Sequence, residues 1–310
     1  MAGITDRPMR ALAARYGAGL VVSEMIASAA LTTGHQDMVR KLAPSPGLPH
    51  MVQLAGCEAP WMSEAARIAE DAGADIIDIN FGCPAKRVTN GYAGSALMRV
   101  PDLAQALVEA VVSATSRPVT VKMRLGWDDD SLNAPEIARR AVEAGARMIT
   151  VHGRTRQQFY KGSARWDLVR AVVEAVSVPV VVNGDITDLA AAEEALRLSG
   201  AAAVMLGRGA QGQPWVVGQI AAGLAGETGP AAPTGAELIG VVVEHYEGVL
   251  SEYGTTVGVR AARKHLDWYL EASGLPVAKD VRRLLVESQD PREVVALIES
   301  IFSGEMREAA

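Results

Sequence analysis

The sequence is poor in cysteine, in aromatic residues and in long apolar runs. Its 310 residues include only two cysteines, Cys57 and Cys83. Two are too few for a disulfide framework or a cysteine-bound metal cluster, which favours a reducing compartment, the cytoplasm. No apolar run is long enough to cross a membrane, and no charged segment followed by an apolar one indicates a signal peptide. We therefore expect no membrane segment and no metal site.

Positive charge is not in excess either. The formal net charge is −6, from 30 Lys and Arg residues against 36 Asp and Glu residues. This balance argues against nucleic-acid binding over the whole surface, and it leaves only a local basic region as a possible nucleic-acid contact.

The dominant pattern is an alternation of predicted strands and helices, repeated roughly every 25 to 40 residues. The strands read as continuous apolar runs, which is typical of a parallel sheet buried on both faces. The pattern predicts an α/β protein with a TIM (β/α)8 barrel, and the first strand of the barrel would lie before Met1. The predicted strands are 20–26, 50–56, 76–82, 119–126, 148–153, 178–185 and 203–209. The predicted helices between them are 6–16, 61–72, 102–115 with Asp102 as N-cap, 133–144, 166–176, 188–198 and 215–224.

A Gly- and Pro-rich linker, residues 226–233, follows the barrel pattern. Beyond it the sequence shows helical periodicity with no strands. We expect two domains, a barrel over residues 1–226 and a small helical domain over residues 234–310. The helices predicted for the second domain are 234–253, 257–272, 278–287 and 291–302.

The segment Asn80-Phe-Gly-Cys-Pro84 directly follows a predicted strand. Gly82 and Pro84 end the strand in a tight turn with Cys83 at its tip. A free cysteine is usually a small buried apolar residue. In an α/β barrel, however, the carboxyl ends of the strands carry the chemistry, and polar residues follow this turn. We therefore predict a functional role for Cys83.

Lys122 is the second residue that is hard to explain by packing. It lies in a predicted buried strand between apolar neighbours, and a lysine is almost never buried without a partner. Lys122 therefore indicates an anion or a polarised carbonyl group at the barrel mouth. His152 could be either functional or a hydrogen-bonded structural group. The other polar residues at predicted strand ends are Gln53, Asn80, Arg124, Arg154, Asn183, Asp185 and Arg208.

Two glycine-containing loops follow the last two predicted strands, at residues 183–185 and 207–212. Loops at this place in a barrel commonly bind phosphate through backbone N–H groups. Together they favour a phosphate-bearing ligand. A Rossmann dinucleotide site is excluded, because no Gly-x-Gly-x-x-Gly opens a helix in the first repeat.

Eight segments taken in order resemble the tRNA-dihydrouridine synthases. Residues 258–270 also resemble the tail of the bacterial B-type branch, once labelled a nitrogen-regulation protein. The resemblance runs from residue 1 into the helical tail. One difference is that the family's opening motif has a Pro before the residue that is Met1 here, and a strand before that. The segments are Met1–Asp6, Gln53–Gly56, Asn80–Pro84, Gly94–Leu97, Val121–Trp127, Val151–Arg156, Asn183–Asp185 and Gly207–Gly209.

The resemblance implies an FMN-binding barrel, a helical tRNA-binding domain, and NADPH-dependent reduction of the C5–C6 double bond of a uridine. It assigns Cys83 as the acid that delivers a proton to C5, and an ordinary thiol, with a pKa of about 8.5, is mostly protonated at neutral pH. It places Met1 and Ala2 along the flavin, and Gln53 and Lys122 at the polar edge of the isoalloxazine. The residues that it places around the ribityl chain and phosphate are His152, Asn183, Gly184, Asp185, Gly207 and Arg208.

A uridine has to leave its stack to reach a barrel mouth, so basic residues near the mouth and in the tail are candidate tRNA contacts. We expect a basic stripe from mouth to tail. The alternative for each residue is a solvated face paired with a neighbouring acid. The candidate contacts are Asn80, Lys86, Arg87, Arg154, Arg156, Arg260, Arg263 and Lys264. Further basic residues of the same stripe are Lys161, Arg165, Lys279, Arg282 and Arg283.

Three other functions stay open at this point. The first is a flavoenzyme that acts on a free pyrimidine, and the second is a non-catalytic RNA-binding regulator. The third is an aldolase or isomerase that binds a phosphorylated substrate, but this one explains neither Cys83 nor the helical tail. We expect the protein to be a monomer.

Overall fold

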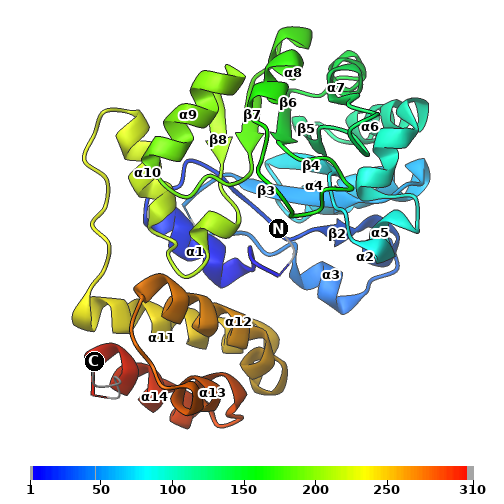
Figure 1. Cartoon of the computed structure of the whole chain (residues 1–310). Coiled ribbons are helices and arrows are strands. Elements are labelled where there is room, and N and C mark those ends of the chain that lie inside the picture. Colours follow the sequence, from blue (N-terminus) through cyan, green and yellow to red (C-terminus); the bar gives the residue numbers. More distant parts are fainter. Residues whose placement is uncertain (1–2, 46, 306–310) are drawn as a thin grey trace.

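The computed structural model describes residues 3–45 and 47–305, apart from the side chain of residue 87. Its first part is a parallel sheet enclosed by helices (Figure 1). The strands are β1 (Val21–Val22), β2 (Ile26–Ala27), β3 (His50–Ala55), β4 (Ile76–Phe81), β5 (Val119–Arg124), β6 (Met148–His152), β7 (Val180–Asn183) and β8 (Ala203–Met205). The longer helices around them are α1 (Arg7–Arg15), α4 (Ala59–Asp71), α6 (Pro101–Ala114), α7 (Ala134–Glu143), α8 (Arg170–Ala175), α9 (Leu189–Ser199) and α10 (Val216–Leu224). Shorter ones are α2 (Ser28–Thr32), α3 (Gln36–Arg40), α5 (Lys86–Thr89), and the 3-10 turns η1 (Gly94–Arg99), η2 (Asp167–Val169) and η3 (Arg208–Ala210).

The strands follow one another around the sheet in the order β1-β3-β4-β5-β6-β7-β8, and β2 also pairs with β3. All pairs are parallel, and helices lie between successive strands. This is the wall of a TIM-type barrel, so the predicted fold class is confirmed. Within the described residues β1 and β8 are the two ends of the sheet.

Two local predictions were wrong. The single strand predicted for residues 20–26 is divided into β1 and β2, because the hydroxyl of Ser23 accepts the hydrogen bond from the Gln53 N–H (3.0 Å) in place of a backbone carbonyl. Asp102 is not the N-cap of α6. Val100 occupies that position, Pro101 takes the first helical position, and Asp102 lies in the first turn, where it pairs with Arg140 (2.6 Å).

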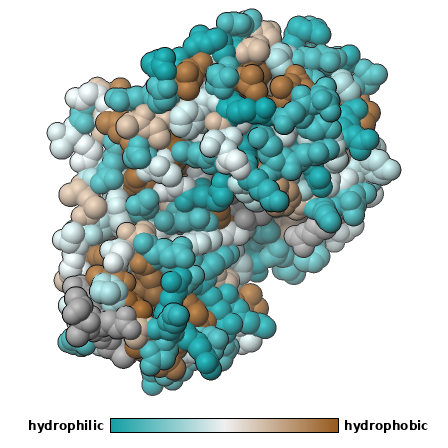
Figure 2. Space-filling view, in the orientation of Figure 1, coloured by the Kyte–Doolittle hydropathy of each residue, from teal (hydrophilic) through white to brown (hydrophobic). Residues whose placement is uncertain are grey.

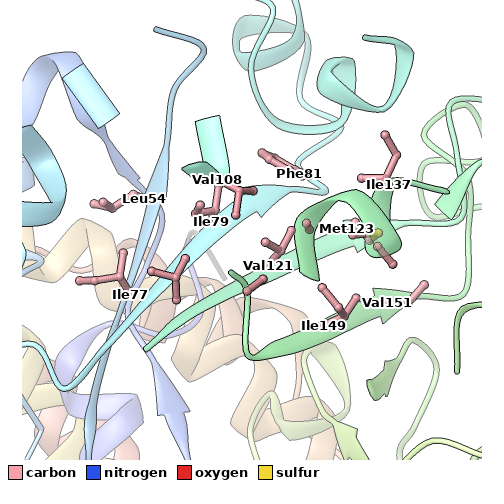
Figure 3. Close-up of a cluster of buried hydrophobic side chains, with 14 of the residues drawn as sticks. Leu54, Ile77, Ile79, Phe81, Val108, Val121, Met123, Ile137, Ile149 and Val151 are labelled. Carbon is pink, nitrogen blue, oxygen red and sulfur yellow. The ribbon is translucent and has the colours of Figure 1, made fainter. Parts of the chain in front are cut away.

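Strands β3 to β7 are buried on both faces, as predicted, whereas β1 and β8 are partly exposed, and the buried strands are not continuous apolar runs. In β4, Ile77, Ile79 and Phe81 alternate with Asp78 and Asn80. The apolar series packs against the helices. Figure 3 shows side chains of β4, β5 and β6 gathered with Val108 of α6 and Ile137 of α7. The alternate residues of the same strands are polar and face the barrel interior, which is where the candidate site lies.

The second part of the chain consists of α11 (Gly235–Tyr253), α12 (Thr255–Ser273), α13 (Lys279–Glu287) and α14 (Pro291–Ser303). A long connection joins α10 to α11 (Figure 1). These helices bury their own apolar cluster, which also includes Leu12 of α1 and Trp215. The helical prediction is correct here to within two residues at each end. The separate cluster is what two domains would require, but the boundaries 226 and 234 stay a prediction.

The tail is attached to the barrel by a buried charged group as well as by apolar packing. Asp6 is the N-cap of α1 and accepts a hydrogen bond from the Met9 N–H (3.1 Å). Its other oxygen accepts one from His265 of α12 (2.9 Å), and His245 of α11 lies 3.8 Å away. Burial alone would raise the pKa of Asp6. The two histidines outweigh burial and hold the pKa far below its usual value, so the carboxylate stays charged.

A glycine lets the tail come still closer. Gly212, in the loop after β8, has a φ of 68°, and a Cβ atom there would lie 2.1 Å from the Trp268 carbonyl oxygen of α12. No other residue fits without moving the helix. The loop after the last strand and the backbone of α12 are therefore in direct contact.

The outer surface offers no membrane segment. Figure 2 shows hydrophilic residues over most of the visible face, with apolar residues in small separate groups. Among the helices of residues 3–45 and 47–305, none is both long and apolar enough to cross a bilayer.

We predict that Asp6→Asn lowers the free energy of unfolding by about 3 kcal/mol, since it removes a buried charge that two histidines face. Asp188→Asn is the matched control, because Asp188 also caps a helix by accepting from Ala191 N–H (2.8 Å) but is exposed, and asparagine caps equally well. The measurement is urea denaturation at pH 7.

The pH dependence of the free energy of unfolding gives a second check on the role of Asp6. A carboxyl whose pKa is lowered by folding stabilises the protein above about pH 4, and this contribution is lost as the pH falls further. The difference between wild type and Asp6→Asn should therefore be constant from pH 7 to about pH 5 and shrink below pH 4. If Asp6→Asn and Asp188→Asn lowered the free energy of unfolding equally, the stabilising role assigned to the buried Asp6 charge would be contradicted.

Candidate active site

Polar side chains of neighbouring strands lie side by side in the barrel interior. The strand register sets them in three rows, each row lying closer to the carboxyl ends of the strands than the one before. Because the strands are parallel, the last row lies at the barrel mouth. The rows are Gln53, Asp78 and Thr120; then Asn80, Lys122 and Thr150; then Arg124, His152 and Asn183.

The first row is joined to the Cys83 turn by a chain of hydrogen bonds. Asp78 accepts from the Thr120 hydroxyl (2.6 Å) and from the Gln53 amide (2.7 Å). The Gln53 carbonyl oxygen accepts from the Asn80 amide (2.8 Å), and the Asn80 oxygen accepts from the Cys83 backbone N–H (2.8 Å). Each of these side chains fixes the orientation of the next, so the position of Cys83 is set from within the barrel.

Asp78 is a candidate site residue that the sequence analysis missed. It is 2% exposed. Burial raises its pKa to about 6, although the hydrogen bonds from Thr120 and Gln53 and the charge of Lys122 act in the opposite direction. The signal was present in the sequence, because an Asp flanked by Ile77 and Ile79 in a predicted buried strand needs a partner.

Lys122 extends from the second row toward the mouth. Its ammonium group donates to the Asn183 side-chain oxygen (2.9 Å), and the Asn183 amide in turn donates to the Met205 carbonyl (2.7 Å). An ammonium group has three N–H donors, so Lys122 keeps capacity for a further acceptor. The predicted need of Lys122 for a polar partner is thus met in part by Asn183.

The charge of Lys122 is held in a mixed electrostatic environment. Burial and repulsion from Arg124 lower its pKa to about 8, although Asp78 and Cys83 act to raise it. Cys83 also acts electrostatically on Arg124, whose guanidinium donates to the Gly82 carbonyl (2.9 Å). The Arg124 guanidinium thus lies against the backbone of the Cys83 turn, and the thiol is within electrostatic reach of both cations.

His152 lies in the third row beside Gly184. Burial, with repulsion from four neighbouring cations, lowers its pKa to about 2, so the imidazole is neutral at physiological pH. Its ring makes no hydrogen bond to any residue in the described part of the chain. Gly184 has a φ of 117°, and a Cβ there would lie 2.7 Å from His152 Cδ2. The glycine thus lets the backbone of this loop pack directly against the neutral imidazole, where any side chain would collide with the ring.

The loop after β7 carries an ion pair between a buried arginine and a partly exposed carboxylate. Arg154 donates through both terminal nitrogens to Asp185 (2.8 and 2.6 Å), and Arg208 approaches the same carboxylate at 3.5 Å. Burial alone would raise the pKa of Asp185, but the hydrogen bonds and charge of Arg154 hold it below its usual value. Asp185 has a φ of 54°, a conformation uncommon outside glycine, which the ion pair helps to maintain.

The burial of Arg154 does not fit its predicted role as a tRNA contact. Arg154 is 2% exposed, and its remaining N–H groups donate to the carbonyls of Lys161 and Gly162. It is a structural support of the mouth. Arg208, by contrast, is 46% exposed at its side chain and follows Gly207, which precedes η3.

The predicted basic stripe is present only in parts. Arg165, Arg282 and Arg283 each pair with an acidic side chain at 2.6 to 2.9 Å, which is the alternative considered for such residues. Asn80 is buried, and its amide already donates to Gln53 and accepts from the Cys83 N–H, so its contact with RNA stays a prediction.

The remaining predicted contacts have no carboxylate partner in the described part of the chain. Arg260 and Arg263 donate to backbone carbonyls of the tail, Lys86 is exposed, and Lys264 points toward Gly3 at the start of the chain. Arg156 lies over the Trp127 ring. Met1, Ala2 and the side chain of Arg87, also predicted to act here, lie outside the described residues.

Taken together, the mouth joins four cations to two carboxylates. The cations are Lys122, Arg124, Arg154 and Arg208, and the carboxylates are Asp78 and Asp185. Such an excess suits an anionic ligand, and the loops at 184–185 and 207–209 are at the place where barrels bind phosphate. The Cys83 thiol, the neutral His152 imidazole and the Lys122 ammonium group belong to the same mouth.

Comparison with known proteins agrees with this arrangement. The sequence model of the dihydrouridine synthase (Dus) family matches residues 1–306. A probable tRNA-dihydrouridine synthase of Rhodobacter capsulatus is 57% identical over 100% of this chain and 94% of its own length. One of Rhizobium leguminosarum bv. phaseoli is 53% identical over 100% and 96%. The tRNA-dihydrouridine synthase B of Xanthomonas axonopodis pv. citri is 45% identical over 98% and 91%.

We predict that Arg154→Lys destabilises the protein by about 3 kcal/mol. Lysine cannot reproduce the two-pronged pair with Asp185, and it leaves the Lys161 and Gly162 carbonyls without the donors that Arg154 supplies. Arg208→Lys should cost less than about 0.5 kcal/mol, because that contact is long and exposed. Urea denaturation of both variants compares them, and a loss of similar size in each would show that the Arg154 pair has no special weight.

Proposed function

The chain belongs to the dihydrouridine synthase family, and from that premise we propose that it is an FMN-dependent enzyme that uses NADPH to reduce the C5–C6 double bond of a uridine in tRNA. The observation that carries the proposal is the place of Cys83. Its turn is fixed from inside the barrel by Asn80, and its side chain lies near Lys122 and Arg124.

The residues at the mouth fit FMN. A flavin mononucleotide has a dianionic phosphate and a planar ring with a polar edge. Arg208 and the glycine-containing loops suit the phosphate, and Lys122 suits the polar edge. Gly184 packs directly against the neutral His152, which sets the position of this ring at the mouth. FMN, when bound, supplies the hydride for C6 of the uracil.

The chain itself supplies a proton and positive charge. Reduction builds negative charge on the uracil, and a positioned acid has to deliver a proton to C5. We assign that role to the thiol of Cys83. The turn holds the thiol in place, since the Cys83 N–H donates to Asn80 and its carbonyl accepts from Ser95 N–H and hydroxyl (3.1 and 2.8 Å). Lys122 and Arg124 stabilise the charge that develops nearby.

We assign tRNA binding to the helical part, residues 234–310, together with the mouth of the barrel, residues 1–226. Arg260 and Lys264 lie on α12, and Lys264 reaches toward the start of the chain beside the barrel. The target uridine must leave its stack to enter. We place the reaction in the cytoplasm and propose a monomer that needs no metal ion for catalysis. The nucleoside composition of tRNA from a deletion strain with and without the gene tests the activity.

We predict that Cys83→Ala keeps bound flavin and NADPH oxidation but loses dihydrouridine formation by at least 100-fold, in the range typical for loss of a general acid. Cys57→Ala is the control, since the Cys57 thiol only donates a weak hydrogen bond to the Gly91 carbonyl (3.0 Å). Mass spectrometry of tRNA nucleosides measures product. Undiminished product from Cys83→Ala would remove this residue from the mechanism.

Lys122→Met should reduce flavin occupancy or slow flavin reduction about tenfold, because an isosteric apolar side chain removes the cation beside the polar edge. Lys279→Met, at an exposed position on α13, should change neither. The flavin absorbance spectrum and the rate of its bleaching by NADPH report both quantities. A colourless wild-type protein would instead favour an RNA-binding regulator, and turnover of free uracil would favour an enzyme for free pyrimidines.

A further inference from the structure

A cavity lies at the rim of the barrel mouth, apart from the rows of polar residues described above. Its volume is about 430 Å³, which is in the range of small-molecule sites. It lies between η1, the start of α6 and the loop after β5. Trp127, Arg99 and Asp128 are among the residues that line it. None of these residues has a role in the proton and hydride chemistry proposed for the mouth.

Trp127 carries two guanidinium groups. Arg99 lies over the indole ring at 4.9 Å from its centroid and Arg156 at 4.6 Å. Neither arginine forms an ion pair within the described part of the chain, and Arg99 is exposed. The indole therefore holds two unpaired planar cations in fixed orientations. Nucleobases stack on such planes, and their phosphates pair with such charges.

The cavity is rigidly connected to the Cys83 turn. Ser95, in η1, donates through both its N–H and its hydroxyl to the Cys83 carbonyl, and Arg99 ends the same η1 turn. On the other side, the Arg156 N–H donates to the Gly126 carbonyl (3.0 Å), next to Trp127. A ligand in the cavity would thus sit at a set offset from the thiol.

The polar lining of the cavity accepts hydrogen bonds. Asp128 accepts from the Ser131 hydroxyl (2.6 Å), and a carboxylate has lone pairs for further donors. The Asn133 amide donates to the Met98 carbonyl (2.7 Å), which fixes the orientation of the amide. Its oxygen is buried without a partner in the described part of the chain. Acceptors suit the exocyclic amino group of adenine, cytosine or guanine better than the two carbonyls of uracil.

We propose that this cavity, the Trp127 subsite, binds a nucleotide of the tRNA close to the uridine that is reduced. Its base stacks on the exposed face of Arg99, its amino group meets Asp128, and its phosphate pairs with Arg99 and Arg156. The proposal rests on the proposed tRNA substrate. The same chemistry would also suit the adenosine phosphate of a dinucleotide. The subsite is assigned to RNA because it opens at the rim, where the chain on either side of an extruded base must pass.

The test compares Arg99→Ala, Arg99→Lys and Trp127→Leu with Arg197→Ala, an exposed arginine of α9 that pairs only with Glu194. Loss of one stacked base and one phosphate contact should raise KM for tRNA about tenfold in Arg99→Ala and Trp127→Leu, with kcat changed less than twofold. Arg99→Lys keeps the positive charge but lacks the planar guanidinium group, so its KM for tRNA should lie between those of wild type and Arg99→Ala. The salt dependence of tRNA binding should flatten by roughly one phosphate contact in Arg99→Ala.

Two further readouts separate the possible outcomes. KM for NADPH should be unchanged, and a rise in that constant alone would assign the cavity to the dinucleotide and overturn the proposal. Ultraviolet cross-linking of tRNA to the full chain should place a cross-linked nucleotide on the Trp127 peptide, and this requires no catalysis. Cross-links elsewhere, with KM for tRNA within twofold of wild type, would exclude the subsite while leaving the proposed activity intact. Wild-type protein that forms no dihydrouridine but cross-links at Trp127 would exclude the proposed activity and leave the RNA subsite intact.

Discussion

The structure depends on one constraint, that polar side chains buried inside a barrel must find their partners there. Asp78 is the clearest case. A carboxylate at that depth is tolerated only because Thr120 and Gln53 both donate to it, and the engagement of Gln53 turns its other end toward Asn80. The result is a fixed turn at the end of β4. The Cys83 thiol at the mouth is therefore positioned by polar groups buried inside the barrel.

The same principle attaches the helical tail to the barrel. Asp6 satisfies the first turn of α1 and at the same time meets His265 from a helix more than 250 residues further along the chain. Leu12 and Trp215 bury apolar surface against α11 and α12, whereas the Asp6 carboxylate makes a directional contact that sets the orientation of the tail. The tail is held in one orientation, with Lys264 of α12 facing the start of the chain. An RNA bound to the tail would consequently approach the mouth from a defined side.

Much of this could be predicted from the sequence, because the strands and helices have strong local signals. The long helices and β3 to β7 lie within a few residues of their predicted bounds. The short helices α2, α3 and α5 have too few residues to show a period, and the break at Ser23 depends on a hydroxyl that replaces a backbone acceptor. The candidate site divides in the same way. Cys83 and Lys122 stand out by chemical type against an apolar background, whereas the burial of Arg154 follows from a partner, Asp185, that lies 31 positions away. The stack of Arg99 on Trp127 likewise joins two loops that no local pattern connects.

The contact between Gly212 and α12 limits how proteins of this kind can be recombined. A glycine-rich loop that touches a helix backbone, with no side chain between them, has no freedom to adapt to a differently placed helix. A chimera that takes its barrel from one relative and its tail from another would have to preserve both the glycine and the height of that helix. Otherwise the loop after β8, which contains Gly212, would collide with the helix backbone and would have to move. The barrel and the tail therefore have to match each other at this contact.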